Sequence, residues 1–272
     1  MAADDAPILD DKHHGEPSAF TPESLLREAR RQKGLPAAKV PGVCVLDPDG
    51  DIVRELRRAG RAHRDPSWAC YHTDLYLVRD GDSAYGLIGG AVGAPFAVLV
   101  AEEFFACGCE YLLSITSAGQ IAPIGPPPYF ILIDRALRDE GTSYHYLPAA
   151  RYSEADPNLV HAAQRALADV DVVVLRGPTW TTDAPFRETA TTIDARRAEG
   201  VLAVEMEAAA LYAFATARRR PVLCVAHVTN QMGQADGDFE KGEANGARDA
   251  LRVIEAIIGH VARASSTVRA HP

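Results

Sequence analysis

Two acidic side chains, Glu205 and Glu207, flank Met206 at the start of an otherwise apolar stretch, VEMEAAALYAFA, which spans residues 204–215. The spacing predicts a helix that is apolar on every side and therefore buried. A carboxylate in such surroundings costs several kcal/mol of folding free energy unless it is hydrogen-bonded or paired with a cation. The two glutamates are therefore candidate site residues, and the alternative is an ordinary buried helix whose acids pair with arginines.

Short apolar runs alternate with helical patterns along the rest of the chain. Strands are predicted over 42–47, 74–78, 84–90, 111–115, 129–134, 171–176 and 221–229. Helices are predicted over 21–34, 94–108, 157–170, 204–215 and 246–264, the first beginning at the N-cap Thr21 and ending at Gly34. This alternation predicts one α/β domain, residues 21–263, with a largely parallel or mixed sheet covered on both faces. The polar ends, 1–20 and 264–272, are expected to be flexible tails.

Four loops that follow predicted strands are rich in glycine, hydroxyl or other polar side chains. They read GGAVGAP, TSAGQIAP, RGPTWTTDAPFRET and TNQMGQADGD. Ligands of open α/β sheets gather where loops leave the carboxyl ends of the strands. We therefore expect these four loops to line the site.

The composition argues against several classes of protein. The chain has 272 residues, 47% of them hydrophobic, and a net charge of -9 without a basic cluster, which argues against nucleic acid or a membrane as partner. Five cysteines in mostly apolar surroundings are typical of a reduced, cytoplasmic protein, and the N-terminus does not resemble a secretory signal. Dinucleotide, P-loop, nucleophile-elbow and zinc-protease motifs are missing, so neither a metal nor a redox cofactor is expected.

Several stretches, taken together and in order, resemble one enzyme family. They are GGAVGAPFAVLVAEEF, ITSAGQIAP, DEGTSYHYLP, GPTWTTDAPFRET and VEMEAAAL. Between about Pro41 and Gly259 the chain resembles the nucleoside phosphorylases, a family that includes uridine phosphorylase, hexameric purine nucleoside phosphorylase and methylthioadenosine nucleosidase. The resemblance implies a mixed, partly barrel-like sheet, cleavage of a nucleoside N-glycosidic bond, and a homo-oligomer built from dimers, often a hexamer.

The same resemblance assigns roles to the acidic pair. It implies that Glu207 accepts hydrogen bonds from the ribose 2'- and 3'-hydroxyls, that Met206 packs against the sugar, and that Glu205 lies close by. Breaking the C1'–N bond builds positive charge on the ribose, as in glycoside hydrolysis. A buried anion that fixes the two hydroxyls can stabilise this charge, so Glu207 is expected to act on the transition state rather than as an acid or base.

The phosphate side departs from the family pattern. Phosphate-using relatives carry an arginine where this chain has Ser114, and another in an early turn that here contains Asp47, Asp49 and Asp51. A third, from a neighbouring subunit, would correspond to the segment around His72. A rebuilt site could use the hydroxyls of Ser114, Thr116 and Ser117, the Gly119 amide and His72. Alternatively, water is the nucleophile, as in the nucleosidases; the overall pattern favours inorganic phosphate as co-substrate.

The base side is less defined. Purine-cleaving relatives place an aspartate where this chain has Asn230, which can donate a hydrogen bond but not a proton. This favours a pyrimidine-type or otherwise self-stabilised leaving base. Trp180 and Phe186 are candidate stacking surfaces, and Arg187 could bind a base carbonyl or form a salt bridge. Asp183 is interpreted as a helix cap. A nucleoside-binding protein without activity is a third possibility.

Overall fold

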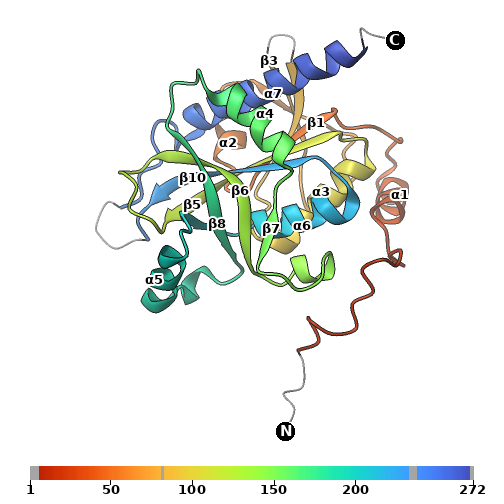
Figure 1. Ribbon diagram of the computed structural model, residues 1–272. Helices are drawn as coiled ribbons and strands as arrows, with labels where there is room; N and C mark the ends of the chain where they lie inside the picture. Colours follow the sequence, from red (N-terminus) through yellow and green to blue (C-terminus); the bar gives the residue numbers. More distant parts are fainter. Residues whose placement is uncertain (1–5, 81–82, 233–237, 270–272) are drawn as a thin grey trace.

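The centre of the molecule is one mixed sheet of ten strands, seen in the computed structural model (Figure 1). The structure describes residues 6–80, 83–232 and 238–269. The strands are β1 (Val43–Asp47), β2 (Ala62–Arg64), β3 (Tyr76–Asp80), β4 (Ser83–Gly89), β5 (Tyr111–Gln120), β6 (Tyr129–Asp139), β7 (Tyr152–Glu154), β8 (Val174–Thr182), β9 (Ala203–Glu205) and β10 (Val222–Asn230).

Five of these strands close on themselves. The order β10-β6-β8-β9-β5 returns to β10 because β5 and β10 also pair, and β1, β4, β3 and β2 extend the sheet from β5. The pairs β4/β1, β1/β5 and β5/β10 are parallel, so the carboxyl ends of these four strands lie along the same edge. The predicted mixed, partly barrel-like sheet is confirmed. The loops that leave this edge carry the candidate site.

Helices cover the sheet on two sides. They are α1 (Pro22–Lys33), α2 (Asp51–Arg58), α3 (Ala94–Ala106), α4 (Pro157–Leu167), α5 (Ala190–Ala198), α6 (Ala208–Arg218) and α7 (Ala247–Arg269). Figure 1 shows α3 packed on α6 below the sheet and α4 packed on α7 above it. Among the residues of α6, Ala208 to Phe214 are all buried, as expected of a helix without a polar face. No helix in the described part of the chain is long and apolar enough to cross a membrane.

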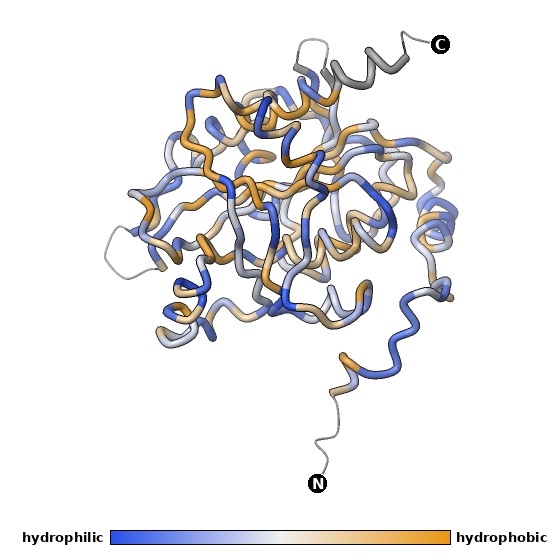
Figure 2. Tube along the Cα trace, viewed as in Figure 1, coloured by the Kyte–Doolittle hydropathy of each residue, from blue (hydrophilic) through white to orange (hydrophobic). Residues whose placement is uncertain are grey.

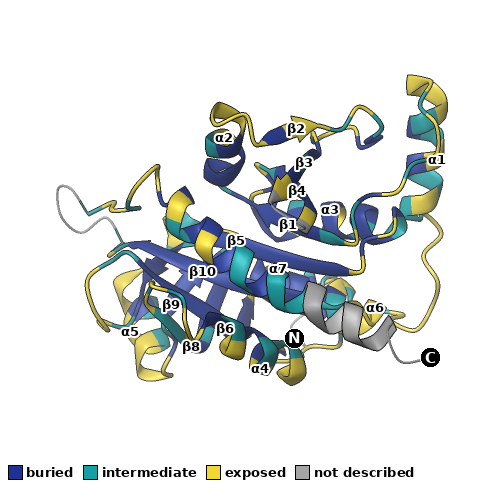
Figure 3. Cartoon of the chain, turned by 90° about the horizontal axis from the view of Figure 1, so that it is seen from above, coloured by how far each residue is buried: buried dark blue, intermediate teal, exposed yellow. Residues whose placement is uncertain are grey.

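The hydrophobic core follows the strands. Hydrophobic segments run through the sheet in Figure 2. The view from above in Figure 3 shows the strands of the sheet mostly buried, while the outer faces of α1 and α5 are exposed. The main core includes residues from β1, β5, β6 and β10 together with α3, α6 and α7. A smaller cluster consists of Ile121, Leu137, Trp180, Ile193, Val201 and Val204.

Local signals at the ends of α1 are confirmed. The Thr21 hydroxyl accepts a hydrogen bond from the Ser24 N–H at 3.2 Å, and Gly34 ends the helix in the left-handed conformation at φ 65°. α7 continues to Arg269, beyond its predicted end at Ala264. Residues 6–20 contain neither helix nor strand, and His14 lies against the backbone carbonyl of Tyr144.

The secondary structure differs from the prediction in several places. The acidic pair is not inside a helix, because β9 ends at Glu205 and α6 begins only at Ala208. β5 and β8 are longer than predicted, so Thr116, Ser117 and Trp180 lie in strands rather than loops. The helices α2 and α5 and the short strands β2, β7 and β9 were not predicted. The strands are extended by pairing with neighbours that are distant in sequence, which local periodicity does not report.

Candidate active site

The carboxylate of Glu205 is fully used by the protein. Its Oε1 accepts hydrogen bonds from the hydroxyls of Thr179 at 3.0 Å and Thr181 at 2.5 Å. Its Oε2 accepts from the backbone N–H groups of Glu207 and Ala208, each at 2.7 Å. Two of these donors are N–H groups at the start of α6, which have no partner inside the helix. Glu205 therefore joins β8 to the N-terminus of α6, and this contact ends the strand and starts the helix where they are observed.

Glu207 differs because each of its oxygens has one protein donor. Oε1 accepts from the Gly93 N–H and Oε2 from the Thr116 hydroxyl, both at 2.7 Å. The side chain is 1% exposed. Burial, together with the negative charge of Glu205, raises the pKa of Glu207 to about 8, although the two hydrogen bonds oppose the shift. A carboxylate has about four lone-pair positions, so capacity for further donors is left.

Glycine is needed where α3 approaches Glu207. Gly93 is the N-cap of α3 and adopts φ 90°, a conformation that side chains with a Cβ rarely take. This geometry directs the Gly93 N–H at the carboxylate, so the starts of α3 and α6 and strand β5 meet at Glu207. Sequence reasoning had placed Gly93 in a ligand loop without giving it a contact.

The hydroxyl of Ser117 defines the other side of the site. It donates to Asp49 Oδ1 at 3.0 Å, and Asp49 lies in the turn between β1 and α2. A cavity of about 20 Å³ opens here. Thr116, Ser117, Asp47, Asp49, Asp51, Ile52, Ile115, His227, Lys241, Asn245, Gly246, Ala247 and Ala250 line it. The predicted hydroxyls Thr116 and Ser117 are therefore brought together with the three acids of the turn.

The acids of this turn have distinct environments. Asp47 is buried, accepts from the Val53 N–H at 2.9 Å, and has its pKa raised to about 7, mainly by burial. Asp51 accepts from Arg54 at 2.5 Å and from Lys241 at 2.6 Å. Hydrogen bonds and charge from these two cations lower the pKa of Asp51 despite the burial that opposes them. The turn therefore carries negative charge next to Ser117, with Lys241 as the nearest cation on the cavity wall.

Ser114 and His72 occupy other places. Ser114 lies within β5, between β1 and β10, and its buried hydroxyl has no partner among the described residues. His72 packs edge-on against Phe96 at 6.4 Å and lines an open apolar hollow with Pro95, Phe96 and Leu99. Neither residue lines the cavity at Ser117.

Asn230 reaches the site from the end of β10. It pairs in register with Gly119 of β5, and its Oδ1 accepts from the Met232 N–H at 2.9 Å. A Cβ at Gly119 would stand 3.2 Å from Asn230 Oδ1 and 2.4 Å from the sulfur of Met232, so the lack of a side chain permits this close approach. The same Cβ would stand 3.3 Å from Cγ1 of Val204, the residue that precedes Glu205. Asn230 and the acidic pair therefore lie on either side of Gly119.

The aromatic candidates of the base side are not gathered in a pocket. Trp180 is 2% exposed, packs in the smaller hydrophobic cluster, and donates to Asp139 Oδ2 at 2.9 Å, so its ring face is not free for a base. Phe186 is 99% exposed. Arg187 follows it in a short helix, and no ion pair involves it within the described residues. Asp183 accepts from the Gly141 N–H at 2.8 Å instead of capping a helix.

Sequence reasoning missed several contributors to the site. Thr179 and Thr181 hold Glu205, while His227 and Lys241 line the cavity at Ser117. Lys241 is one of four lysines in the chain, which is a weak signal. These residues are distant in sequence from Glu207, and only the closure of the barrel brings them together.

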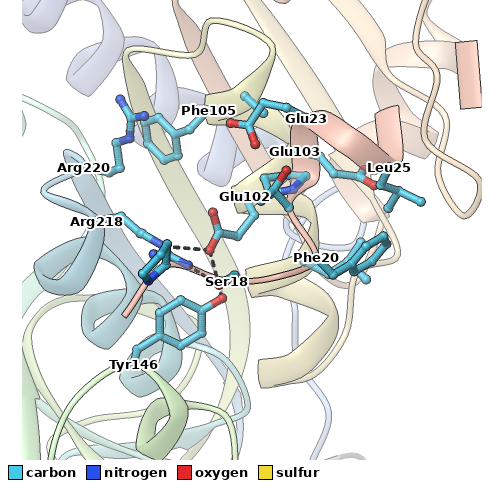
Figure 4. Close-up of a pocket in the computed structure, with 15 residues that line it drawn as sticks. Ser18, Phe20, Glu23, Leu25, Glu102, Glu103, Phe105, Tyr146, Arg218 and Arg220 are labelled. Atoms are coloured by element: carbon cyan, nitrogen blue, oxygen red, sulfur yellow. Dashed lines mark hydrogen bonds and ion pairs between the residues drawn. The ribbon is translucent and has the colours of Figure 1, made fainter. Parts of the chain in front are cut away.

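A separate cavity of about 490 Å³ lies between the N-terminal segment, α3 and the end of α6 (Figure 4). Within it, Glu102 Oε1 accepts from Arg218 at 3.0 Å and from the Tyr146 hydroxyl at 3.1 Å. Neither Glu207 nor Ser117 lines this cavity. It is therefore distinct from the candidate active site.

Comparison with proteins of known sequence gives two similar relatives. A guanosine phosphorylase of Halorubrum lacusprofundi is 30% identical over 177 residues, which cover 64% of this chain and 69% of that protein. A uridine phosphorylase of Thermococcus kodakarensis is 28% identical over 181 residues, which cover 60% of this chain and 64% of the relative. Both matches therefore include most of each chain.

Comparison with solved structures agrees with the fold. A uridine phosphorylase from Vibrio fischeri ES114 superposes with a TM-score of 0.67 at 19% identity, covering 83% of this chain and 92% of that one. A purine nucleoside phosphorylase from Toxoplasma gondii, solved with immucillin-H, superposes with a TM-score of 0.71 at 14% identity, covering 84% and 93%. The sequence model of the phosphorylase superfamily matches residues 43–259. The chain belongs to the phosphorylase superfamily.

Proposed function

We propose that this protein is a nucleoside phosphorylase, which cleaves the N-glycosidic bond of a nucleoside with inorganic phosphate to give a free base and a pentose 1-phosphate. The observation that carries the proposal is the buried Glu207 carboxylate, held by one donor on each oxygen. Membership of the superfamily and the guanosine and uridine phosphorylases among the relatives support it.

Glu207 is the proposed ribose ligand. Gly93 and Thr116 fix its two oxygens and leave lone pairs for the 2'- and 3'-hydroxyls of the sugar. As the C1'–N bond breaks, positive charge develops on the ribose ring. A preorganised, water-excluded carboxylate that holds the hydroxyls stabilises this charge more strongly than the neutral ground state. Met206, directly before it and half-buried, is proposed to pack against the sugar.

Phosphate is proposed to enter from the side of Ser117 and to attack C1' as the base leaves. The Ser117 hydroxyl and the backbone N–H of Gly119 are its candidate neutral donors, whereas the proton of the predicted Thr116 hydroxyl is already donated to Glu207. Asn230, next to Gly119, is proposed to face the base. An amide can donate a hydrogen bond to the departing base but cannot protonate it, so the enzyme should favour bases that leave as stabilised anions.

We further infer a homo-oligomer built from dimers. Leu99, 36% exposed, lines the apolar hollow with His72, Pro95 and Phe96, and the ring of Tyr71, which is 41% exposed, lies 6.3 Å from that of His72. Such exposed apolar groups commonly mark an interface between subunits. Light scattering of the purified protein tests the assembly.

The five cysteines are all free thiols, which fits a reducing compartment such as the cytoplasm.

A nucleoside panel assayed with and without phosphate tests the proposed reaction. Release of base that depends on phosphate, with pentose 1-phosphate as the second product, is the expected result. Base release at the same rate without phosphate would identify a hydrolase instead. Nucleoside binding without turnover, measured by calorimetry, would identify a binding protein.

A further inference from the structure

A carboxylate occupies the place where the nucleophilic anion is expected. Asp49 Oδ1 accepts from the Ser117 hydroxyl at 3.0 Å, and Asp49 Oδ2 lies 3.7 Å from the ammonium of Lys241. A hydroxyl donor and a cation are the contacts that a phosphate oxygen would seek. In the unliganded protein, Asp49 therefore satisfies an anion-binding position with its own negative charge.

Lys241 is held over this position by the backbone. The Glu240 N–H donates to the Thr229 carbonyl at 2.8 Å, which places Lys241, the next residue, beside the end of β10. The Lys241 ammonium then donates to Asp51 Oδ2 at 2.6 Å, and its side chain is 30% exposed. No arginine lines the cavity at Ser117 within the described residues. Lys241 therefore takes the place of the arginines expected of a phosphate site.

A second polar group faces the same cavity without a partner. His227 is 6% exposed, and its Nε2 has no hydrogen-bond partner among the described residues. The ring stacks on Phe130 at 4.4 Å, and β10 places His227 in register with Ser117. Burial and the nearby charge of Lys241 lower the pKa of His227 to about 4, so the ring is neutral at physiological pH. A neutral imidazole can donate one N–H to an anion.

Access to this position depends on Asp49. The cavity of about 20 Å³ has room for about one water molecule and not for phosphate. Asp49 lies in a turn and is 30% exposed, so rotation of its side chain toward solvent would enlarge the cavity and free the Ser117 hydroxyl. The Lys241 ammonium would keep its hydrogen bond to Asp51 and have its remaining N–H donors for an anion. The backbone carbonyl of Asp49, which accepts from Arg54 at 3.0 Å, can stay in place during this rotation.

We propose that Lys241 binds the phosphate nucleophile at Ser117, that His227 contributes a further hydrogen bond, and that Asp49 is an internal competitor which phosphate displaces. This inference rests on the proposed phosphorylase function. It assigns phosphate recognition to a lysine after β10 and a histidine within β10. The affinity for phosphate then depends on how strongly Asp49 competes with phosphate for Ser117 and Lys241.

The test is the KM for phosphate and the KM for nucleoside in four variants of the full chain. Lys241→Met should raise the phosphate KM roughly tenfold or more, because a charge-assisted hydrogen bond is lost, and should leave the nucleoside KM nearly unchanged. Lys241→Arg should restore most of the phosphate affinity. Asp49→Ala should lower the phosphate KM several-fold. Lys39→Met, at an exposed lysine outside the cavity, is the control for loss of a positive charge.

The outcomes separate this inference from the proposed function. Base release by the wild type that ignores phosphate would overturn both. Phosphate-dependent release in which Lys241→Met keeps the wild-type phosphate KM would overturn only the role of Lys241. An unchanged or higher phosphate KM in Asp49→Ala would overturn the competition. Matching unfolding curves for the variants and the wild type exclude misfolding as the cause.

Discussion

Replacing Glu207 by glutamine removes the proposed catalytic charge with little change in shape. The Gly93 N–H can only donate, so the amide oxygen of the new side chain must remain on that side. The amide nitrogen then faces Thr116, whose hydroxyl can rotate from donor to acceptor. Both protein hydrogen bonds can therefore be kept, and the variant is expected to fold.

The expected loss of activity follows from the change of acceptor. Hydrogen bonds to a charged group contribute roughly 1.5–3 kcal/mol, against about 1 kcal/mol for neutral pairs. Two ribose hydroxyls that bind an amide instead of a carboxylate should therefore lose on the order of 1.4–3 kcal/mol of transition-state stabilisation. This corresponds to a fall in kcat/KM of about tenfold to more than a hundredfold.

The same substitution should increase stability at high pH. The pKa of Glu207 is about 8 in the folded protein and 4.5 as the ordinary value of the unfolded chain. Below pH 4.5 both states hold the proton, and as the pH rises toward 8 the unfolded state releases it first, so wild-type stability falls. The full loss is at most about 5 kcal/mol. Glutamine does not ionise, so the variant should gain stability relative to wild type between pH 5 and pH 9.

Two assays decide the matter. Urea unfolding at pH 5, 7 and 9 should show the stability difference between Glu207→Gln and wild type growing with pH. The pH profile of wild-type kcat/KM should rise as Glu207 ionises near pH 8, and this rise should be missing in the variant. A folded variant with unchanged kcat/KM would refute the ribose assignment, and a stability difference independent of pH would refute the raised pKa.

Three further substitutions probe the neighbouring contacts. Glu205→Ala leaves the N–H groups of Glu207 and Ala208 without acceptors, and urea unfolding should show a loss of roughly 2–5 kcal/mol; a loss below about 1 kcal/mol would contradict its structural role. Thr116→Val removes a donor to Glu207, so the pKa of that carboxyl should rise further and the ascending limb of the pH–rate profile should move to higher pH; an unmoved limb counts against the contact. Asn230→Asp places a proton donor beside the base, so a nucleoside panel should show a higher ratio of purine to pyrimidine cleavage, and an identical profile would mean that this residue does not face the base.

The sequence was sufficient to predict the fold class and the family. Alternating apolar and helical patterns report secondary structure because they reflect which faces are buried. The motif around Glu207 was informative because burying a carboxylate costs free energy unless hydrogen bonds or a cation compensate for it. The cap at Thr21 was also predicted correctly, since capping depends on residues adjacent in sequence.

The exact place of Glu205 and Glu207 could not be predicted in this way. Local periodicity favours a helix from Val204, yet four donors from β8 and α6 hold Glu205 in a strand end. The burial of Trp180 could not be predicted either. An aromatic residue in a polar segment shows the same local pattern whether it contacts a ligand or packs in the smaller hydrophobic cluster, as Trp180 does.

By itself, the amino-acid sequence determined the α/β architecture, the identity of the family and the presence of two buried glutamates in one motif. Only the tertiary structure distinguished the two glutamates. Glu205 accepts hydrogen bonds from four protein donors, whereas Glu207 accepts from two and has lone pairs left for further donors. It also brought Asp49, Ser117, His227 and Lys241 to one cavity. The physical reason is that these contacts arise from pairing between strands far apart in the chain, and closure of the barrel sets which side chains meet.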